Sequence, residues 1–199
     1  MSFFNIVAAT NEDTVVATYE PSKVRSDSYQ SEAELEKEFI RLLCEQGYTY
    51  LPLHTEDELI ANLRSQLEEL NHYKFSDTEW RQFFSDVIAN PNEHIPEKTR
   101  KIQEDNVQVL HRDDGSSKNI TLIDKKNIHN NRLQVINQYE VKQADGARHD
   151  NRYDVTILVN GFPLVHVELK RRGVAIREAF NQINRYQRDS FWAGCGLYE

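Results

Sequence analysis

The chain has 199 residues, 28% of them charged and 39% hydrophobic, and a formal net charge of −8 at pH 7. Its length supports one well-buried core, alone or with an appendage. The negative charge argues against nucleic-acid binding over the whole surface, and the lack of a long apolar run argues against a membrane-spanning helix.

Helical signals dominate the first half of the sequence. Ser31 is followed three residues later by Glu34, and Ser76 by Glu79, and both pairs are capping boxes that predict a helix start. Gly47 supplies a helix stop. The elements expected here are an irregular or edge segment at 1–28, helices at 30–46, 57–71 and 77–90, a short strand at 48–53, and a loop marked by Pro91 and Pro96.

From Asn106 onward the hydrophobic pattern becomes that of strands. An Asn160-Gly161 pair between two β-branched runs is a strong hairpin signal. The elements expected here are strands at 107–111, 120–123 and 133–141, a polar loop at 144–151, a hairpin at 152–170, and a helix at about 174–189. This order predicts an α/β (α+β) fold, a mixed β-sheet flanked by helices, with the helical stretch 57–104 inserted into the core.

Three charged residues interrupt the apolar runs of the hairpin: Asp154 in the first run, and Glu168 and Lys170 in the second. Charge buried in a strand is costly unless it is paired or binds a metal ion. Carboxylate oxygens suit Mg²⁺, which polarises a phosphate and activates water. The pattern therefore predicts a magnesium site for phosphodiester hydrolysis, with Asp154 and Glu168 on the ion and Lys170 stabilising negative charge or positioning the water. The competing interpretation is a solvated strand, on which Glu-x-Lys is common.

Whether Asp154 reaches Glu168 depends on the turn between the strands. A regular two-residue loop pairs Val159 with Phe162 and sends Asp154 to the opposite face. A three-residue loop pairs Leu158 with Phe162 and brings Asp154 diagonal to Glu168. A β-bulge elsewhere in the hairpin would have the same effect. A shared metal ion therefore requires an odd-length loop or a bulge.

Basic residues surround this hairpin. Residues 148–190 contain eight lysines and arginines and five acids, a local charge of +3. In the helix that follows, Gln182 and Tyr186 lie four residues apart on one face, with Arg185 beside them. Either these side chains contact DNA phosphate or a neighbouring domain, or they are a surface glutamine and a half-buried tyrosine on a solvated helix.

The arrangement of Asp154, Glu168-x-Lys170 and a helical Gln182-x-x-x-Tyr186 resembles the PD-(D/E)xK nuclease superfamily in its RecB-like branch. More specifically, the chain resembles the N-terminal nuclease domain of the restriction (R) subunit of type I restriction-modification enzymes. The strings that carry this resemblance, in order, are Asp27 to Glu32, Asp124 to Asn127, Asn151 to Gly161 and Glu168 to Ile183. The likeness runs from about residue 27 to residue 192.

The resemblance implies a PD-(D/E)xK restriction-endonuclease-like core with a helical insertion. It implies Mg²⁺-dependent endonuclease cleavage of double-stranded DNA in the cytoplasm, after ATP-driven translocation. It also implies assembly with the methylation and specificity subunits of the type I complex.

The resemblance assigns roles to residues of this chain. The catalytic positions are Asp154, Glu168 and Lys170, and the Gln-x-x-x-Tyr motif is Gln182 and Tyr186. An acid of the first helix often completes the metal site in such nucleases. Glu32 is the best match for that acid, with Glu36 and Glu38 as alternatives. No proline precedes Asp154, a departure that is common in this branch.

The sequence has no G-x-x-x-x-G-K-[ST] loop for ATP. We therefore expect ATP to bind in downstream domains of a longer protein, of which this chain is an N-terminal fragment. In that interpretation the nuclease domain covers 29–192, and 193–199 is a truncated end. Cys44 and Cys195 form no metal-binding pattern, and we expect reduced thiols in a cytoplasmic protein. The alternatives are a stand-alone RecB-like nuclease and a non-catalytic DNA-binding or assembly domain.

Overall fold

A computed structural model gives the coordinates of the chain, and the structure describes residues 3–9, 15–20, 31–141, 151–171, 174 and 176–189. The chain divides into two units, residues 1–30 and 31–199. The smaller unit contains an antiparallel pair of strands, β1 (Phe3–Ala9) and β2 (Val15–Glu20). The N-terminal segment that we expected to be irregular or an edge thus includes a β-hairpin.

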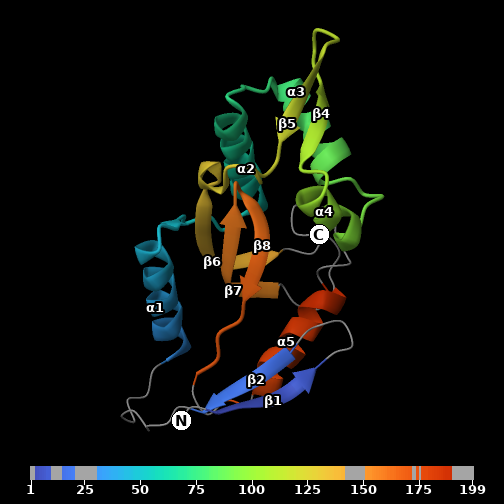
Figure 1. Ribbon diagram of the computed structural model, residues 1–199. Helices are drawn as coiled ribbons and strands as arrows, with labels where there is room; N and C mark the ends of the chain where they lie inside the picture. Colours follow the sequence, from blue (N-terminus) through green and yellow to red (C-terminus); the bar gives the residue numbers. More distant parts are fainter. Residues whose placement is uncertain are drawn as a thin grey trace. The chain divides into compact units, whose positions relative to one another are not determined.

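A four-stranded mixed sheet in the order β3-β6-β7-β8 lies in the larger unit (Figure 1). β3 (Thr49–Tyr50) runs parallel to β6 (Leu133–Val141). β6, β7 (Asn151–Val159) and β8 (Phe162–Val167) are antiparallel neighbours. The expected mixed sheet is confirmed, and β8, the second half of the predicted hairpin, is one of its edge strands.

Helices pack on both faces of this sheet. α1 (Glu32–Glu45) packs Leu43 against Val135 and Val155 on one face. α2 (Glu56–Asn71) packs on the other face through three fully buried side chains, Leu59, Leu63 and Leu67. Their four-residue spacing puts these leucines on one side of the helix, so α2 forms the apolar layer beneath the sheet.

The helices begin where the capping signals place them. Ser31 accepts a hydrogen bond from the backbone N–H of Glu34 and returns one from its own N–H to the Glu34 carboxylate. Ser76 and Glu79 make the same reciprocal pair at the next predicted start. A further capping box, at Thr55, begins α2 one residue earlier than expected.

The segment between β3 and β6 holds more structure than the sequence indicated. The expected helix at 77–90 is divided into α3 (Asp77–Phe83) and a π-helical turn, η1 (Phe84–Ile88). The loop expected around Pro96 is wrong in part, because α4 (Ile95–Gln103) begins there. Pro96 lies in the first helical turn, where a backbone N–H has no partner within the helix to lose.

β4 (Val107–His111) and β5 (Ser117–Thr121) form a separate antiparallel pair, and β5 begins three residues before the expected strand at 120–123. Leu110 and Ile120 of this pair are buried with Trp80 and with the leucines of α2. The same cluster contains Ile136 of β6 and Leu158 of β7, so this pair of strands shares one core with the main sheet.

The remaining helical elements are η2 (Ile128–Asn130), a single 3-10 turn, and α5 (Ile176–Asp189). α5 confirms the helix expected at about 174–189. Among the helices in the described ranges, none combines the length and the apolar character that crossing a bilayer demands.

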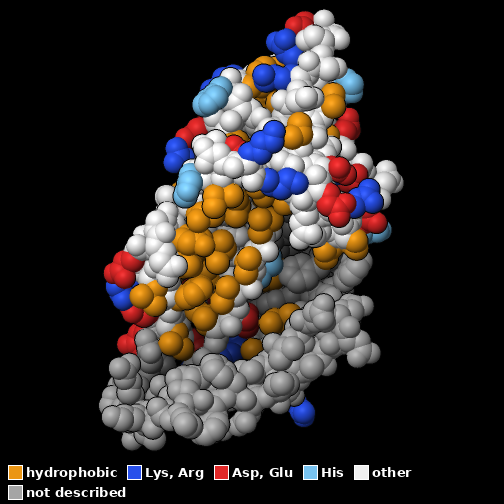
Figure 2. Space-filling model, in the orientation of Figure 1, with side chains coloured by type: hydrophobic (Ala, Val, Ile, Leu, Met, Phe, Trp, Pro, Cys, Tyr) orange, Lys and Arg blue, Asp and Glu red, His pale blue; other side chains and the backbone are white. Residues whose placement is uncertain are grey.

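On one face of the sheet, several hydrophobic side chains are left partly exposed. Figure 2 shows hydrophobic side chains gathered over the region of β6, β7 and β8. Leu133, Leu164 and Val165, which belong to β6 and β8, are between 37% and 47% exposed. Within the described part of the chain, α1 therefore covers only part of this face.

Candidate active site

The hairpin of β7 and β8 is closed by a tight two-residue turn. Val159 pairs with Phe162, and Asn160 and Gly161 between them have φ values of 50° and 85°. Two positive φ values in sequence are the requirement of a type I′ turn. The Asn160 side chain is buried, and its Oδ1 accepts a hydrogen bond from the backbone N–H of Arg132 at 2.8 Å. The turn is thereby fixed to the start of β6.

A β-bulge in β8 changes the register of the hairpin. The pairing of β7 with β8 shifts by one residue at Leu164, which has no partner on β7. The last pair beyond this bulge joins Val155 to Val167. Continued by one position, the shifted register sets Asp154 across from Glu168. The predicted bulge is confirmed, whereas the odd-length loop is not the solution that the structure uses.

The structure brings Asp154, Glu168 and Lys170 together at the end of this hairpin. The Asp154 Oδ2 accepts a hydrogen bond from the backbone N–H of Leu169 at 2.9 Å. The Lys170 ammonium donates to Glu168 Oε1. The Glu168 side chain is only 4% exposed and that of Lys170 is 20% exposed. Two opposite charges are therefore held largely out of water, in the paired form that makes their burial tolerable.

The surroundings of the site raise the pKa of both Glu168 and Lys170 above their ordinary values. Burial raises the pKa of Glu168, and the neighbouring Asp154 carboxylate adds to this, against the opposing effect of Lys170. Burial opposes the charge on Lys170, but the hydrogen bond to Glu168 and the carboxylates of Glu168, Asp154 and Glu32 outweigh it and raise the pKa of Lys170. Lys170 is consequently a cation at neutral pH, and the two carboxylates repel each other.

Glu32, the first residue of α1, lies at the border of this site. Its Oε1 accepts a hydrogen bond from the backbone N–H of Arg171 at 3.3 Å. Its charge also contributes to the raised pKa of Lys170. The helix that carries Glu32 is therefore attached to the segment that follows Glu168.

The two alternative acids of α1 make other contacts. Glu36 accepts hydrogen bonds from the side-chain amides of Asn137, at 2.6 Å, and Gln138 in β6. Glu38 forms a salt bridge of 2.6 Å with Arg41 of its own helix, and both side chains are about half exposed. Glu38 is thus engaged on the solvent side of the helix.

The donor chemistry of the pair Asp154 and Glu168 suits a hard cation. Within the described residues, no three acidic, histidine or cysteine side chains gather closely enough to hold an ion between them. Glu32 therefore stands beside the pair of Asp154 and Glu168, at the backbone of Arg171, and its role as a metal ligand stays a prediction. Mg²⁺ commonly keeps several waters and binds through one or two carboxylates, so the pair alone fits this ion.

A histidine to which the sequence pattern assigned no role, His166, lies two residues before Glu168 in the chain. The His166 ring stacks on the Tyr153 ring with centroids 4.4 Å apart, and its Nδ1 lies 2.9 Å from the Thr156 hydroxyl. Burial lowers the pKa of His166 to about 4. A neutral imidazole therefore lies against Tyr153 and Thr156 of β7, on the strand that leads to Glu168. No local pattern marks this role, because it depends on the shifted register.

The predicted helical motif is described only in part. Gln182 lies half-buried on α5. The side chains of Arg185 and Tyr186 lie outside the described residues. The roles of Gln182, Arg185 and Tyr186 in DNA contact or domain coupling therefore stay predictions.

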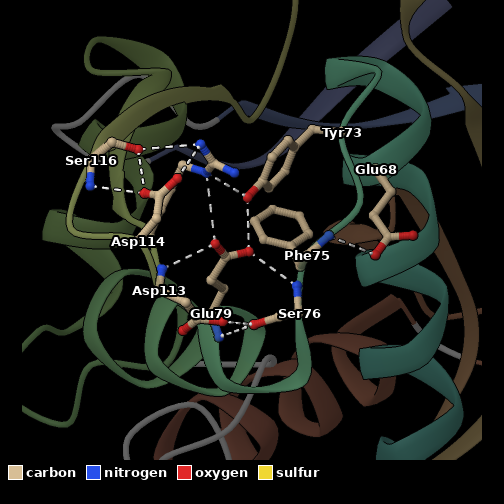
Figure 3. A network of polar contacts seen from close by, with 9 residues as sticks. Glu68, Tyr73, Phe75, Ser76, Glu79, Asp113, Asp114 and Ser116 are labelled. Atoms are coloured by element: carbon tan, nitrogen blue, oxygen red, sulfur yellow. Dashed lines mark hydrogen bonds and ion pairs between the residues drawn. The ribbon is translucent and has the colours of Figure 1, made fainter.

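A second polar network joins the start of α3 to the turn between β4 and β5 (Figure 3). Its centre is the buried carboxylate of Glu79, which accepts hydrogen bonds from the Tyr73 hydroxyl at 2.8 Å and from the backbone N–H groups of Ser76 and Asp113 at 3.0 and 3.3 Å. The bond from Ser76 is the main reason that the pKa of Glu79 is lowered. The Nε of Arg112 donates to the same tyrosine hydroxyl at 3.0 Å. These bonds connect α3 to the β4–β5 pair and give the network a structural role.

Comparison with known proteins agrees with this picture. The family model of the type I restriction enzyme R protein N terminus matches residues 29–198. The EcoprrI type I restriction enzyme endonuclease subunit of Escherichia coli is 49% identical over 194 residues, which are 97% of this chain and 61% of that protein.

More distant relatives are considerably longer. The SsaAORF53P endonuclease subunit of Staphylococcus saprophyticus is 37% identical over 168 residues, and the SauMSSORF170P subunit of Staphylococcus aureus is 38% identical over 169. Each alignment covers 82% of this chain but only 17% of the relative. This chain therefore spans 61% of the first relative and a much smaller part of the other two.

Proposed function

Because the chain belongs to the family of the type I restriction enzyme R protein N terminus, we propose that it is the nuclease module of such an enzyme and hydrolyses phosphodiester bonds of double-stranded DNA. The observation that carries this proposal is the bulged hairpin. It places Asp154 across from Glu168 and next to Lys170, in a largely buried position. A domain that only binds DNA or partner subunits has no need to bury these charges, whose desolvation is costly.

The proposed cofactor is Mg²⁺. Asp154 and Glu168 would hold the ion, and Glu32 is the candidate for a further ligand or for a contact through water. When bound, the ion would polarise the scissile phosphate and lower the pKa of an attacking water. Neutralisation of the two carboxylates by the ion also fits their mutual repulsion and the raised pKa of Glu168.

Lys170 supplies the positive charge of the site. Its ammonium is attached to Glu168 and stays protonated in the field of the surrounding carboxylates. In this position it stabilises the negative charge that develops on the phosphate and orients the water. A preorganised donor of this kind contributes about 10²–10³ in rate when removal is tested.

The wider function belongs to a longer assembly. The relatives are named endonuclease subunits of type I restriction enzymes. We propose that the protein containing this chain acts in the cytoplasm with methylation and specificity subunits. We propose that translocation driven by ATP is carried out by other regions of the full-length protein, since the sequence of this chain contains no G-x-x-x-x-G-K-[ST] motif. Gln182, Arg185 and Tyr186 are the proposed DNA-contacting or domain-coupling residues.

The test is a separation of functions in the complete R subunit assembled with its partners. Lys170→Ala is compared with wild type for DNA cleavage in Mg²⁺ and for DNA-stimulated ATP hydrolysis. Lys37→Ala, which removes an exposed lysine of α1, is the matched control. We expect Lys170→Ala to lose cleavage about 10²–10³-fold and to keep ATP hydrolysis, with the control unchanged.

Other outcomes separate the alternatives. Cleavage retained in Lys170→Ala would contradict the catalytic assignment and leave a DNA-binding or assembly domain. Cleavage by the chain alone, without partner subunits or ATP, would indicate a stand-alone nuclease instead.

A further inference from the structure

β6 is irregular at the residue that faces Asp154. The pairs Asn137–Val155 and Tyr139–Tyr153 form the ladder between β6 and β7, and between them Gln138 stands opposite Asp154 without a ladder pair. Gln138 has a φ of 53°, in the left-handed region that residues other than glycine rarely adopt. The irregularity thus lies at the proposed nuclease site, on which the following inference rests.

The left-handed residue lets two consecutive side chains reach one carboxylate. Asn137 Nδ2 donates to Glu36 Oε1 at 2.6 Å, and Gln138 Nε2 donates to Glu36 Oε2. In a regular strand these neighbouring side chains would point to opposite faces of the sheet. We call this group of Glu36, Asn137 and Gln138 the amide clasp. The Tyr50 hydroxyl of β3 supports it from the other side, donating to Asn137 Oδ1 at 2.9 Å.

The same irregularity changes the face that β7 presents. Val155 packs in the cluster with α1, whereas Tyr153, two residues away, packs in the cluster with α2. Regular alternation would put both residues on one face. Asp154 is therefore the residue at which β7 changes face, and its direction depends on the conformation of Gln138 across the ladder.

α1 is in this way attached on both sides of the carboxylate pair. Glu36 binds β6 opposite Asp154, and Glu32, one turn earlier, binds the backbone of Arg171 after Lys170. We propose that Gln138 is a positioning residue of the nuclease site. Through the amide clasp it keeps β6 in the left-handed conformation that directs Asp154 toward Glu168. Hydrogen bonds from two amides to one carboxylate are charge-assisted and strong enough to hold an unfavourable backbone angle.

The first experiment measures binding of Mn²⁺ to the 199-residue chain by calorimetry, as a probe of the carboxylate pair. Gln138→Ala removes the amide and keeps the backbone strain, while Gln138→Gly removes the amide and tolerates the positive φ. Gln138→Glu keeps the shape and sets a second carboxylate against Glu36. Gln108→Ala, in β4, is the control. We expect all three Gln138 variants to bind Mn²⁺ about 10–100-fold more weakly, as for other residues that orient metal ligands.

The second experiment measures cleavage by the assembled enzyme against Mg²⁺ concentration, with thermal unfolding of each variant recorded in parallel. A positioning role predicts that each Gln138 variant needs more Mg²⁺ than wild type for half-maximal cleavage. This should hold for Gln138→Gly as well, although glycine removes the backbone strain. Wild-type Mn²⁺ affinity in a folded Gln138→Gly variant would overturn the proposal and leave the clasp a purely structural link. No Mn²⁺ binding by the wild-type chain would overturn the proposed function itself, and the positioning role with it.

Discussion

Substitution of Gly161 by alanine tests how the hairpin of β7 and β8 is fixed to the core. A Cβ at this position would lie 2.6 Å from Leu63 Cα and 3.0 Å from Leu63 N, in the middle of α2. The contacting atoms are helix backbone, which cannot move aside as a side chain can. The φ of 85° adds strain of about 1–2 kcal/mol for an L-residue, and overpacking adds about 1–3 kcal/mol. We expect a loss of unfolding free energy of about 3 kcal/mol in total.

The matched control is Gly115→Ala in the β4–β5 turn. Gly115 has a similar φ of 79°, but no atom lies within 4 Å of the added Cβ. Its cost is therefore the backbone strain alone, about 1–2 kcal/mol. Urea denaturation followed by tryptophan fluorescence measures the unfolding free energy of both variants. In a separate thermal denaturation, the melting temperature should fall by about 2–4 °C per kcal/mol lost. Equal losses in the two variants would refute the close approach of the turn to α2.

Three further predictions concern the bulge, the polar network and a helix cap. Insertion of one alanine after Val165 shifts the pairing beyond the bulge by one position, so that Asp154 lies across from Val167 and no longer from Glu168; a nicking or cleavage assay should show activity near background while circular dichroism stays close to wild type. Deletion of Leu164, the unpaired residue, keeps Asp154 across from Glu168 and should retain cleavage. The pKa of Glu79 is lowered in the folded state, so the Glu79 carboxylate stabilises the fold at pH values above its ordinary pKa of 4.5, and this stabilisation is lost as the pH falls through the lower folded pKa. In urea denaturation at pH 7, Glu79→Gln should be less stable than wild type, and the difference in unfolding free energy should become smaller in acid. Thr55→Ala removes the cap of α2 and should cost about 1 kcal/mol in the same assay, and no change would contradict the role of the capping box.

Local signals in the sequence were sufficient for much of the fold. The capping boxes at Ser31 and Ser76 involve residues only three apart, and the turn at Asn160 and Gly161 depends on two adjacent residues with positive φ. Such features are determined by neighbours in sequence, so the pattern alone identifies them. α4 was missed because Pro96 was interpreted as a helix breaker, although proline in the first turn is compatible with a helix.

The sequence pointed to the residues of the candidate site, whose catalytic roles stay predictions, but it did not give their full geometry. Asp154, Glu168 and Lys170 stand out because charge interrupts apolar strands. The requirement for an odd-length loop or a bulge also followed from the register. The position of the bulge at Leu164 could not be predicted, because a leucine in a strand gives no sign of being unpaired. The contact of Gln138 with Glu36 could not be predicted either, because the two residues are 102 positions apart in the sequence.

The bulge at Leu164 also affects how the edge strand β8 can pair with other strands. Among the described strands, β8 ends the order β3-β6-β7-β8, so no described strand pairs with its outer hydrogen-bonding groups. Pro163 offers no N–H along this margin, and the extra residue beside it interrupts the even spacing that an incoming strand must match. The same irregularity that aligns the two carboxylates therefore discourages sheet extension between copies of the chain. The strand that leads to the candidate site is thereby a poor template for pairing with a strand of another molecule.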